Sequence, residues 1–259
     1  MKILFIGEIV ARPGRSVVKE VLPEVLENEK PDLVLSNAEN LAHGRGATAG
    51  TIEEMQELGI EFFTGGDHLF WHKGFDKEIG NLPVIRPANI KDDLPGDGYR
   101  VLETKVGKVL IINVMSINSH KYSELNLTNP YLKVEEILEK TADQDVAVSV
   151  VDFHADYTSD KHAMGFFLDG RVDAVLGTHS HVPTCDNRVL PKGTMYVTDV
   201  GMCGNIDSVL GVKKEIIIDR VVYSQKEKFE WELNGRRAFR SIIVDTTKKE
   251  IRRFDKEVI

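Results

Sequence analysis

Short apolar runs recur along the chain, and helical patterns lie between most of them. The runs, each bounded by Gly, Asn or Asp, are residues 2–7, 33–36, 61–64, 109–115, 146–151 and 172–177. The helical patterns are residues 16–28, 51–58, 129–141 and 159–168. Strands that alternate with helices pair in parallel through crossover connections, so this order predicts an α/β fold with a largely parallel sheet.

Two of the helical patterns begin with recognisable signals. Thr51 is followed three residues later by Glu54, which predicts an N-cap at Thr51. Asn129 precedes Pro130, and proline is favoured at the first position of a helix. Both signals support the helices between the strands.

The last quarter of the chain has a different pattern. Residues 195–199, 229–233, 237–247 and 250–254 resemble strands of hairpins, the last two joined at 247–249. They predict a second, more antiparallel sheet that faces the first. Since the sequence has no repeat and no linker, we expect a single domain over residues 1–259, built as a four-layer α/β/β/α sandwich of two mixed sheets flanked by helices.

Charge and cysteine content exclude several classes of protein. The 33 Lys and Arg against 41 Asp and Glu give a net charge of −8, which argues against general nucleic-acid binding but not against a small phosphorylated substrate. Two cysteines imply no disulfide framework. No apolar run reaches eighteen residues, so we expect no membrane association and a cytoplasmic location. Whether the chain forms homo-oligomers is left open.

Polar groups able to bind metal follow nearly every predicted strand. They are Glu8, Glu39, Asn40, Asp67, His68, His154, His179 and His181. The carboxyl ends of parallel strands converge on one crevice, so these distant residues are expected to be neighbours in space.

Each of these residues alone also has a structural explanation. An acidic residue after a strand commonly caps a helix, and a single histidine is commonly a satisfied core or surface group. His179 and His181 are harder to explain in this way, because two imidazoles at i and i+2 can point together where the backbone turns. Agreement among five strand ends favours a metal site.

The donor types indicate which metals would bind. Carboxylates, an amide and imidazoles without a cysteine cluster suit Mn²⁺, Fe or Zn²⁺ better than a thiolate zinc site or a calcium cage. Seven of these eight residues, all but His68, are counted as candidate ligands, which is more than one ion with an open position uses, so two ions are expected. A pair about 3.5–4 Å apart, bridged by a carboxylate and a hydroxide, suits attack on phosphorus.

The sequence resembles the calcineurin-like metallophosphoesterases, and within them the bacterial YmdB family of 2′,3′-cyclic-nucleotide phosphodiesterases. The resemblance covers residues 1 to about 211 in the expected order. The matching segments are residues 3–10, 12–15, 37–40, 66–68, 86–89, 151–155, 168–172, 177–181 and 198–202.

The resemblance implies a role for each matching position. One ion would be held by Glu8, Glu39, Asn40 and His181, and the other by Glu39, Asp67, His154 and His179. His68 would be the proton donor; the alternative is a histidine that only orients a ligand. The implied activity is hydrolysis of small cyclic nucleotides by a metal-bridging hydroxide, with a phosphomonoesterase or nucleotidase as a less favoured alternative.

Two positions depart from the family pattern. The family ordinarily has aspartate in place of Glu8 and asparagine in place of Asp67. The additional carboxylate lowers the positive charge of a two-ion site, so we expect Asp67→Asn to raise turnover and Glu8→Asp to change metal preference. These departures also support an alternative function, a regulatory metal-binding protein with weak or altered phosphoesterase activity.

Other residues near these motifs have two interpretations each. Arg86 and Asn89 would contact substrate by resemblance, or would belong to a rigid turn around Pro87. Phe70, Trp71 and His72 could stack on a base, although aromatic residues after a strand are more often part of the core.

Overall fold

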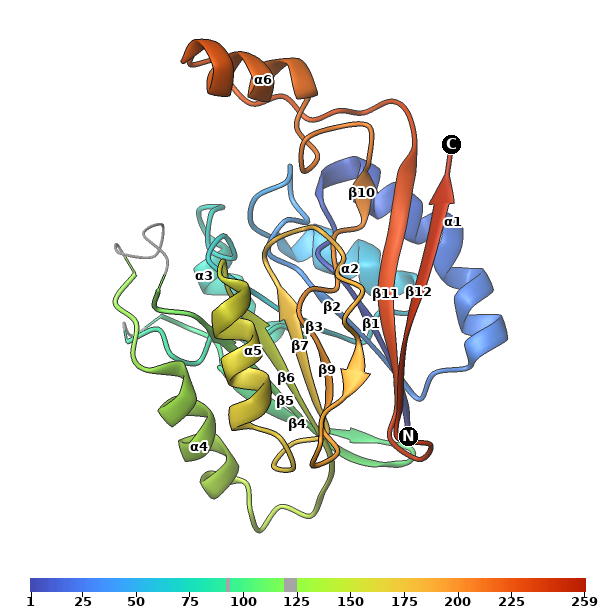
Figure 1. The fold of residues 1–259 in the computed structure, drawn as a ribbon, viewed down its shortest axis with the longest axis vertical. Coiled ribbons are helices and arrows are strands. Elements are labelled where there is room, and N and C mark those ends of the chain that lie inside the picture. Colours follow the sequence, from blue (N-terminus) through green and yellow to red (C-terminus); the bar gives the residue numbers. More distant parts are fainter. Residues whose placement is uncertain (92–93, 119–124) are drawn as a thin grey trace.

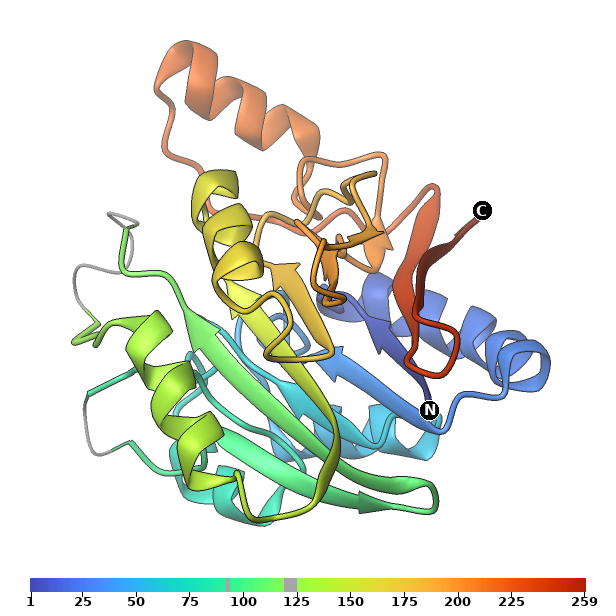
Figure 2. The same cartoon turned by 60° about the horizontal axis from the view of Figure 1, so that its bottom comes forward.

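The chain forms two β-sheets that face each other, with helices on the outer face of each sheet (Figures 1 and 2). The computed structural model describes residues 1–91, 94–118 and 125–259. Within these residues each sheet has six strands. None of the helices in this described part of the chain is long and apolar enough to cross a membrane.

The first sheet combines strands from both ends of the chain in the order β10-β11-β1-β2-β3, with β12 beside β11. Its strands are β1 (Lys2–Ile6), β2 (Leu33–Asn37), β3 (Phe62–Thr64), β10 (Gly204–Asn205), β11 (Arg237–Asp245) and β12 (Glu250–Val258). β1, β2 and β3 run parallel, whereas β11 is antiparallel to β1.

The second sheet has the order β4-β5-β6-β7-β9-β8. Its strands are β4 (Tyr99–Thr104), β5 (Gly107–Met115), β6 (Val146–His154), β7 (Ala174–Thr178), β8 (Arg188–Val189) and β9 (Met195–Val197). β5, β6, β7 and β9 are parallel, and β4 and β8 are antiparallel edge strands.

The helices are placed largely as the alternating pattern requires. They are α1 (Ala11–Glu29), α2 (Ala49–Glu57), α3 (Phe75–Glu78), the 3₁₀ turn η1 (Ile79–Asn81), α4 (Pro130–Lys140), α5 (Thr158–Phe167) and α6 (Lys214–Tyr223). α1 and α2 cover the first sheet and α4 and α5 cover the second, whereas α6 projects from the body of the molecule (Figure 1).

The alternation of side chains along each strand produces the layers. In β1, Leu4 and Ile6 pack with α1 and α2, while Ile3 and Phe5 pack against the second sheet. In β5, Ile111 faces the first sheet, and its neighbours Leu110 and Ile112 face α4 and α5. Burial of each such side chain contributes about 1.5–3 kcal/mol before conformational entropy is subtracted. The predicted four-layer sandwich is confirmed.

The division of strands between the sheets differs from the prediction. The C-terminal hairpin of β11 and β12 joins the first sheet beside β1, and the second sheet is built from β4 to β9. β11 extends β1 because its buried face, which includes Ile242 and Val244, completes the layer between the sheets. Residues 229–233 form no strand and contribute only an isolated bridge at Trp231.

Two predicted helix starts also differ from the structure. The N-cap of α2 is Thr48, and Thr51 completes the capping box from the N3 position, because its own side chain bonds back to the Thr48 backbone. α1 begins at Ala11, five residues before the predicted start, with Pro13 in its first turn. The Asn129 cap and Pro130 of α4 are as predicted.

Candidate metal centre

The seven predicted ligands come together where the strands of both sheets end. They form two groups that share Glu39, and within each group one candidate donor atom per residue lies within 4.8 Å of the others. The first group is Glu39, Asp67, His154 and His179, and the second is Glu8, Glu39 and His181. Asn40 lies beside the second group, since its amide contacts both Glu39 and His181.

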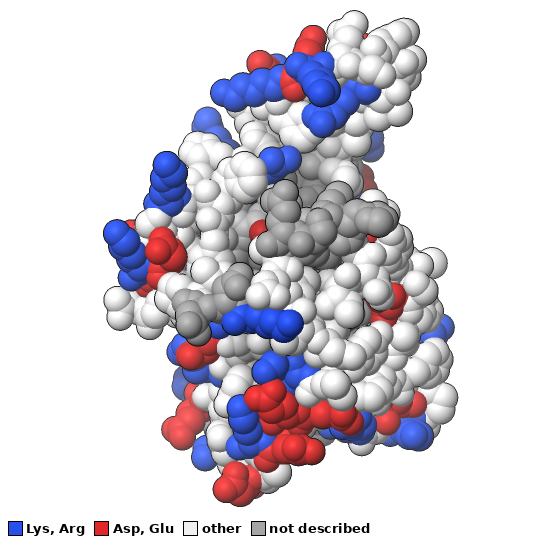
Figure 3. Space-filling view, turned by 90° about the vertical axis from the view of Figure 1, so that its left-hand side faces the viewer, with Lys and Arg blue, Asp and Glu red and all other residues white. Residues whose placement is uncertain are grey.

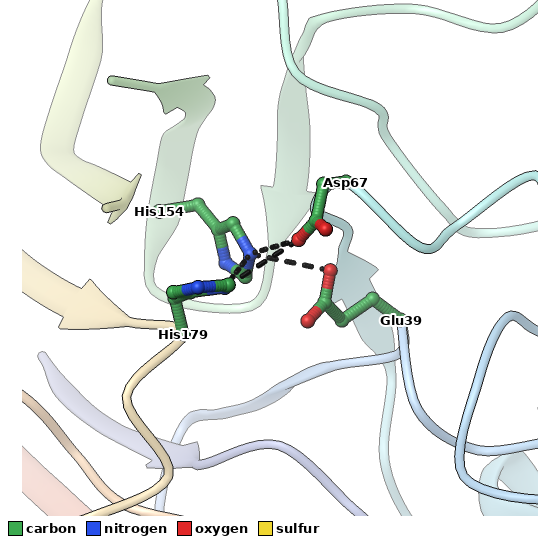
Figure 4. Close-up of side chains that lie close together, drawn as sticks. All are labelled: Glu39, Asp67, His154 and His179. Carbon is green, nitrogen blue, oxygen red and sulfur yellow. Dashed lines mark hydrogen bonds and ion pairs between the residues drawn. The ribbon is translucent and has the colours of Figure 1, made fainter. Parts of the chain in front are cut away.

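The first group surrounds the Nε2 atom of His154 (Figure 4). Asp67 Oδ1 lies 3.0 Å from this atom, Glu39 Oε2 3.2 Å and His179 Nδ1 2.9 Å. The rings of His154 and His179 have centroids 4.6 Å apart. Two carboxylates and two imidazoles therefore direct donor atoms to one point.

In the second group the two carboxylates are buried, and His181 is half-buried. Glu8 accepts a hydrogen bond from the His179 backbone, and its Oε2 is buried without a hydrogen-bond partner among the described residues. The Nδ2 atom of Asn40 lies 2.9 Å from Glu39 Oε1 and 3.3 Å from His181 Nε2. His181 Nδ1 is also buried without a partner among the described residues.

The loop after β7 holds two histidines in an unusual backbone conformation. His179 has φ 96° and His181 has φ 64°, both in the left-handed region that costs energy for residues other than glycine. Asp199 holds this loop in place, because its Oδ2 accepts hydrogen bonds from Ser180 N at 3.0 Å and from Lys161 Nζ at 2.6 Å. This buried ion pair keeps the turn that points both imidazoles inward.

A chain of hydrogen bonds sets the tautomer of His154. Thr178 Oγ1 donates to Asp152 Oδ1 at 2.7 Å, and the same oxygen lies 2.9 Å from His154 Nδ1. Because the Thr178 hydroxyl donates its hydrogen bond to Asp152, its oxygen accepts a hydrogen bond from Nδ1 of His154. Nε2 of His154 then carries no proton, and its lone pair faces the carboxylates. Burial raises the pKa of Asp152 to about 6.

The loop after β3 approaches the site so closely that only glycine fits at position 66. A Cβ atom on Gly66 would overlap Glu39 Oε2 and would lie 2.6 Å from the His154 ring. Both neighbours are buried and cannot withdraw. The close approach carries Asp67 to the two histidines.

The pKa values of the ligand candidates are those expected of a site that binds a cation. Burial raises the pKa of Glu8 and of Glu39, and it lowers the pKa of His154 to about 4 and of His181 to about 3. Neutral imidazoles are the form that binds metal, and buried carboxylates with unsatisfied oxygens need a positive charge nearby. The donor set therefore fits metal ions.

Asp67 also connects the ligand cluster to His68. Burial raises the pKa of Asp67, but the three neighbouring imidazoles lower it overall, well below its usual range. Its Oδ2 lies 2.6 Å from His68 Nδ1, opposite the oxygen that faces His154. His68 keeps a quarter of its side chain exposed, so it can reach a bound molecule.

Arg86 and Asn89 make contacts of a different kind. Asn89 is fully buried, and its amide bonds the backbone of Met115 and Thr128. Arg86 donates to the carbonyls of Pro87 and Leu94. These bonds favour the turn interpretation of this segment.

Four further residues support the ligands, and of these only Asp156, which lies two residues after His154, is expected from the sequence either to orient that histidine or to cap the next helix. Thr178, Lys161 and Asp199 hold ligands in place from behind, and none has a local sequence signal for doing so. Asp156 is close to His154 in the sequence, but its Oδ1 lies 2.6 Å from His179 Nε2 instead.

A family model described as "YmdB-like protein" matches residues 4–258 of the chain. The 2′,3′-cyclic-nucleotide 2′-phosphodiesterase of Bacillus subtilis is 37% identical over 256 residues, which cover 97% of this chain and 95% of that protein.

Solved structures of similar proteins extend over the whole chain. A hypothetical protein from Thermus thermophilus is 33% identical, with a TM-score of 0.90 and 99% of both chains covered. A novel phosphatase of Mycoplasma pneumoniae is 31% identical, with a TM-score of 0.89, covering 100% of this chain and 93% of that one. A 5′-nucleotidase from Candida albicans shares only the fold, with 11% identity, a TM-score of 0.52 and coverage of 78% and 45%.

Proposed function

The chain belongs to the YmdB-like family, and we propose that it is a metal-dependent phosphodiesterase that hydrolyses 2′,3′-cyclic nucleotides or similar small phosphodiesters. The observation that carries the proposal is the convergence of seven donor residues in two groups that share Glu39. The names of its relatives, a phosphodiesterase and a phosphatase, support an enzyme that hydrolyses phosphoric esters.

The two groups would hold one metal ion each. Asp67, His154 and His179 would bind one ion and Glu8, Asn40 and His181 the other, with Glu39 shared. A half-turn of the Asn40 amide would present its oxygen to the ion. Iron or manganese suits these oxygen and imidazole donors, and zinc is the alternative. When bound, two such ions would supply an activated water and neutralise charge on the phosphoryl oxygens.

The protein's own residues would position the ester and move one proton. We propose that His68 gives a proton to the departing 2′ oxygen when the ring of the cyclic phosphate opens, which leaves a 3′-phosphate. Asp67 Oδ2, 2.6 Å from His68 Nδ1, would orient the imidazole and leave Nε2 for the substrate. We also propose that the enzyme works in the cytoplasm, which fits its two free thiols.

The alternative function is a regulatory metal-binding protein with weak phosphoesterase activity. It is supported by one observation, the carboxylate of Asp67, which is the third in the site after those of Glu8 and Glu39. That added negative charge would tighten cation binding and repel a phosphodiester anion.

Turnover of 2′,3′-cyclic AMP separates the two functions. Protein stripped of metal and then reloaded with Mn²⁺ or Fe²⁺ is expected to form 3′-AMP, and His68→Ala is expected to lower kcat by about 10²–10⁴-fold with metal content unchanged. His162→Ala, a partly exposed histidine bonded to Thr198, is the matched control. Wild-type protein with full metal content and no turnover would support the regulatory function.

A further inference from the structure

A row of alternating aromatic rings and guanidinium groups extends outward from His68. The Arg45 guanidinium lies 5.0 Å from the centre of the Trp71 ring and 5.6 Å from that of Phe229. The guanidinium of Arg220, on α6, lies 5.1 Å from the centre of the same Phe229 ring. These side chains come from segments that are far apart in the sequence, so the fold assembles the row.

The row begins at the candidate catalytic histidine. The rings of His68 and Trp71 are stacked, with centroids 6.0 Å apart and an interplanar angle of 23°. The Trp71 backbone also donates to the His68 carbonyl at 2.9 Å. Trp71 is 60% exposed, which is unusual for so large an apolar side chain. Its free surface is therefore available beside the metal centre.

The row lines a groove that is large enough for a ligand. The groove has a volume of about 510 Å³, and His43, His72 and Trp231 complete its walls around Trp71 and Phe229. Gly44 packs directly against one of these walls, because a Cβ atom at this position would overlap the Trp231 ring. The wall formed by Trp231 is thus closely packed against the loop that contains Gly44.

The cations of the groove are not held in ion pairs. Among the described residues, the side chains of Arg45, Arg220 and Lys228 form no ion pair or hydrogen bond, although the whole chain carries a net charge of −8. Glu227 is the one acidic residue of the groove's described lining. Lys and Arg side chains, with Asp and Glu side chains among them, also lie on the projection formed by α6, at the top of Figure 3. An anionic ligand would pair with these cations.

We propose that this groove binds the 3′-terminal nucleotides of a short RNA whose end carries the cyclic phosphate, with a base on Trp71 and upstream phosphates on Arg220 and Lys228. Exposed aromatic rings interleaved with arginines form the surface to which single-stranded nucleic acids bind, by base stacking and charge. A mononucleotide needs only the first ring, whereas the distal cations match phosphates that a mononucleotide lacks. This inference rests on the proposed function, since it places the reacting phosphate at the metal centre.

Three substrates test the groove with metal-loaded protein. They are glycerol 1,2-cyclic phosphate, which has no base, 2′,3′-cyclic AMP, and a triadenylate that ends in a 2′,3′-cyclic phosphate. For the wild type we expect kcat/KM to rise at each step of this series. Trp71→Ala is expected to lose about tenfold more kcat/KM on the two nucleotides than on the base-free ester, and Trp71→Phe to recover most of that loss.

The distal cations are tested by the double variant Arg220→Gln/Lys228→Gln. We expect it to lose about tenfold or more on the triadenylate relative to 2′,3′-cyclic AMP. The matched control is Arg171→Gln, since Arg171 lies 4.8 Å over Phe167 outside the groove. Equal losses on all three substrates, or the same losses in the control, would overturn the proposal.

A binding measurement keeps this test separate from the proposed activity. Fluorescence anisotropy with triadenylate 3′-phosphate measures the groove even if no substrate turns over. The double variant is expected to make the log–log salt dependence shallower by about 1.4, because each lost phosphate contact on a single strand accounts for about 0.7. An unchanged slope would show that the groove does not bind the RNA chain. Binding with this slope change but no hydrolysis of any substrate would contradict the proposed function alone.

Discussion

Asp67 is the residue whose chemistry most affects the site, because its two oxygens serve different neighbours. Oδ1 lies 3.0 Å from His154 Nε2, and Oδ2 lies 2.6 Å from His68 Nδ1. An asparagine would keep one acceptor for the ligand cluster and present an NH₂ group to His68. The side chain at position 67 thus controls both the charge of the centre and the contact to His68.

We predict that Asp67→Asn raises kcat/KM for 2′,3′-cyclic AMP at neutral pH by up to about tenfold. Removal of one negative charge strengthens the attraction for a phosphodiester anion and lowers the pKa of activated water. The pH–rate profiles of both proteins, with metal content measured in each, check this expectation. A variant that is slower at every pH with full metal content would mean that the contact to His68 outweighs the charge.

Cys203, which is not one of the candidate metal ligands, makes the stability of the fold depend on pH. Burial raises the pKa of this thiol to about 12, from an ordinary value of 9, and its sulfur bonds the Arg240 backbone. The folded state therefore favours the protonated thiol. The contribution of the protonated thiol to the free energy of unfolding is fully present below pH 9. It is lost as the pH rises from 9 towards 12, because the thiol of the unfolded chain releases its proton first.

We predict that the free energy of unfolding falls more steeply between about pH 9 and 11 in the wild type than in Cys203→Ala. Comparison of the two proteins cancels the other groups that titrate in this range. In the native protein at about pH 8, a thiol reagent is expected to modify the exposed Cys185 and spare Cys203. Rapid modification of both thiols would refute the assigned burial.

At the scale of elements, α5 and the loop after β9 support the two histidines that follow β7. Lys161 on α5 is 1% exposed and pairs with Asp199, which also bonds the backbone of Ser180 and Gly201. The ion pair therefore joins a helix to the ligand loop. A buried charge that loses its partner costs several kcal/mol.

We predict that Lys161→Met lowers the free energy of unfolding by about 3–5 kcal/mol and weakens metal binding. The double variant Lys161→Met/Asp199→Asn is expected to recover part of the stability, since it leaves no unpaired buried charge. Urea unfolding and metal titration of both variants provide the check. A single variant that matches the wild type in both measurements would contradict the supporting role of the pair.

The sequence predicts helices and strands better than it predicts which side chains pair with one another. Polar residues at strand ends have a local pattern, and for this reason Glu39 and His154 can be proposed as neighbours from the sequence alone. The partnership of Lys161 with Asp199 has no such pattern, because the two residues are far apart in the chain and each is ordinary in its own segment. α6 has no helical signal in the sequence, because its apolar residues, such as Val221 and Val222, are exposed and follow no core-facing period.

At the scale of the whole molecule, the two sheets share one apolar layer. That layer contains Phe5 and Ile242 from the first sheet and Ile111 and Val150 from the second. Sequence patterns predict such strands but not which sheet each joins, because pairing depends on contacts between distant segments. β11 is the example, since its hairpin pattern gives no indication of its place beside β1.

We propose that the chain is one domain and predict that it unfolds as one unit. Tryptophan fluorescence and far-UV circular dichroism are expected to give the same urea midpoint in metal-loaded protein. Ile111→Ala is expected to lower both midpoints together, with a loss of about 2–5 kcal/mol, because it leaves a cavity between the sheets. Two separated transitions would indicate two domains.

Anomalous diffraction from crystals of protein loaded with Mn²⁺, recorded alongside the metal content in solution, decides whether the site holds two ions. We predict two ions per chain, about 3.5–4 Å apart, one on each side of Glu39. Glu39→Gln is expected to lower the occupancy of both positions, whereas Glu54→Gln on α2, which pairs with Arg15, serves as the control. A single ion, or an ordered site without any ion at saturating Mn²⁺, would contradict the two-metal centre.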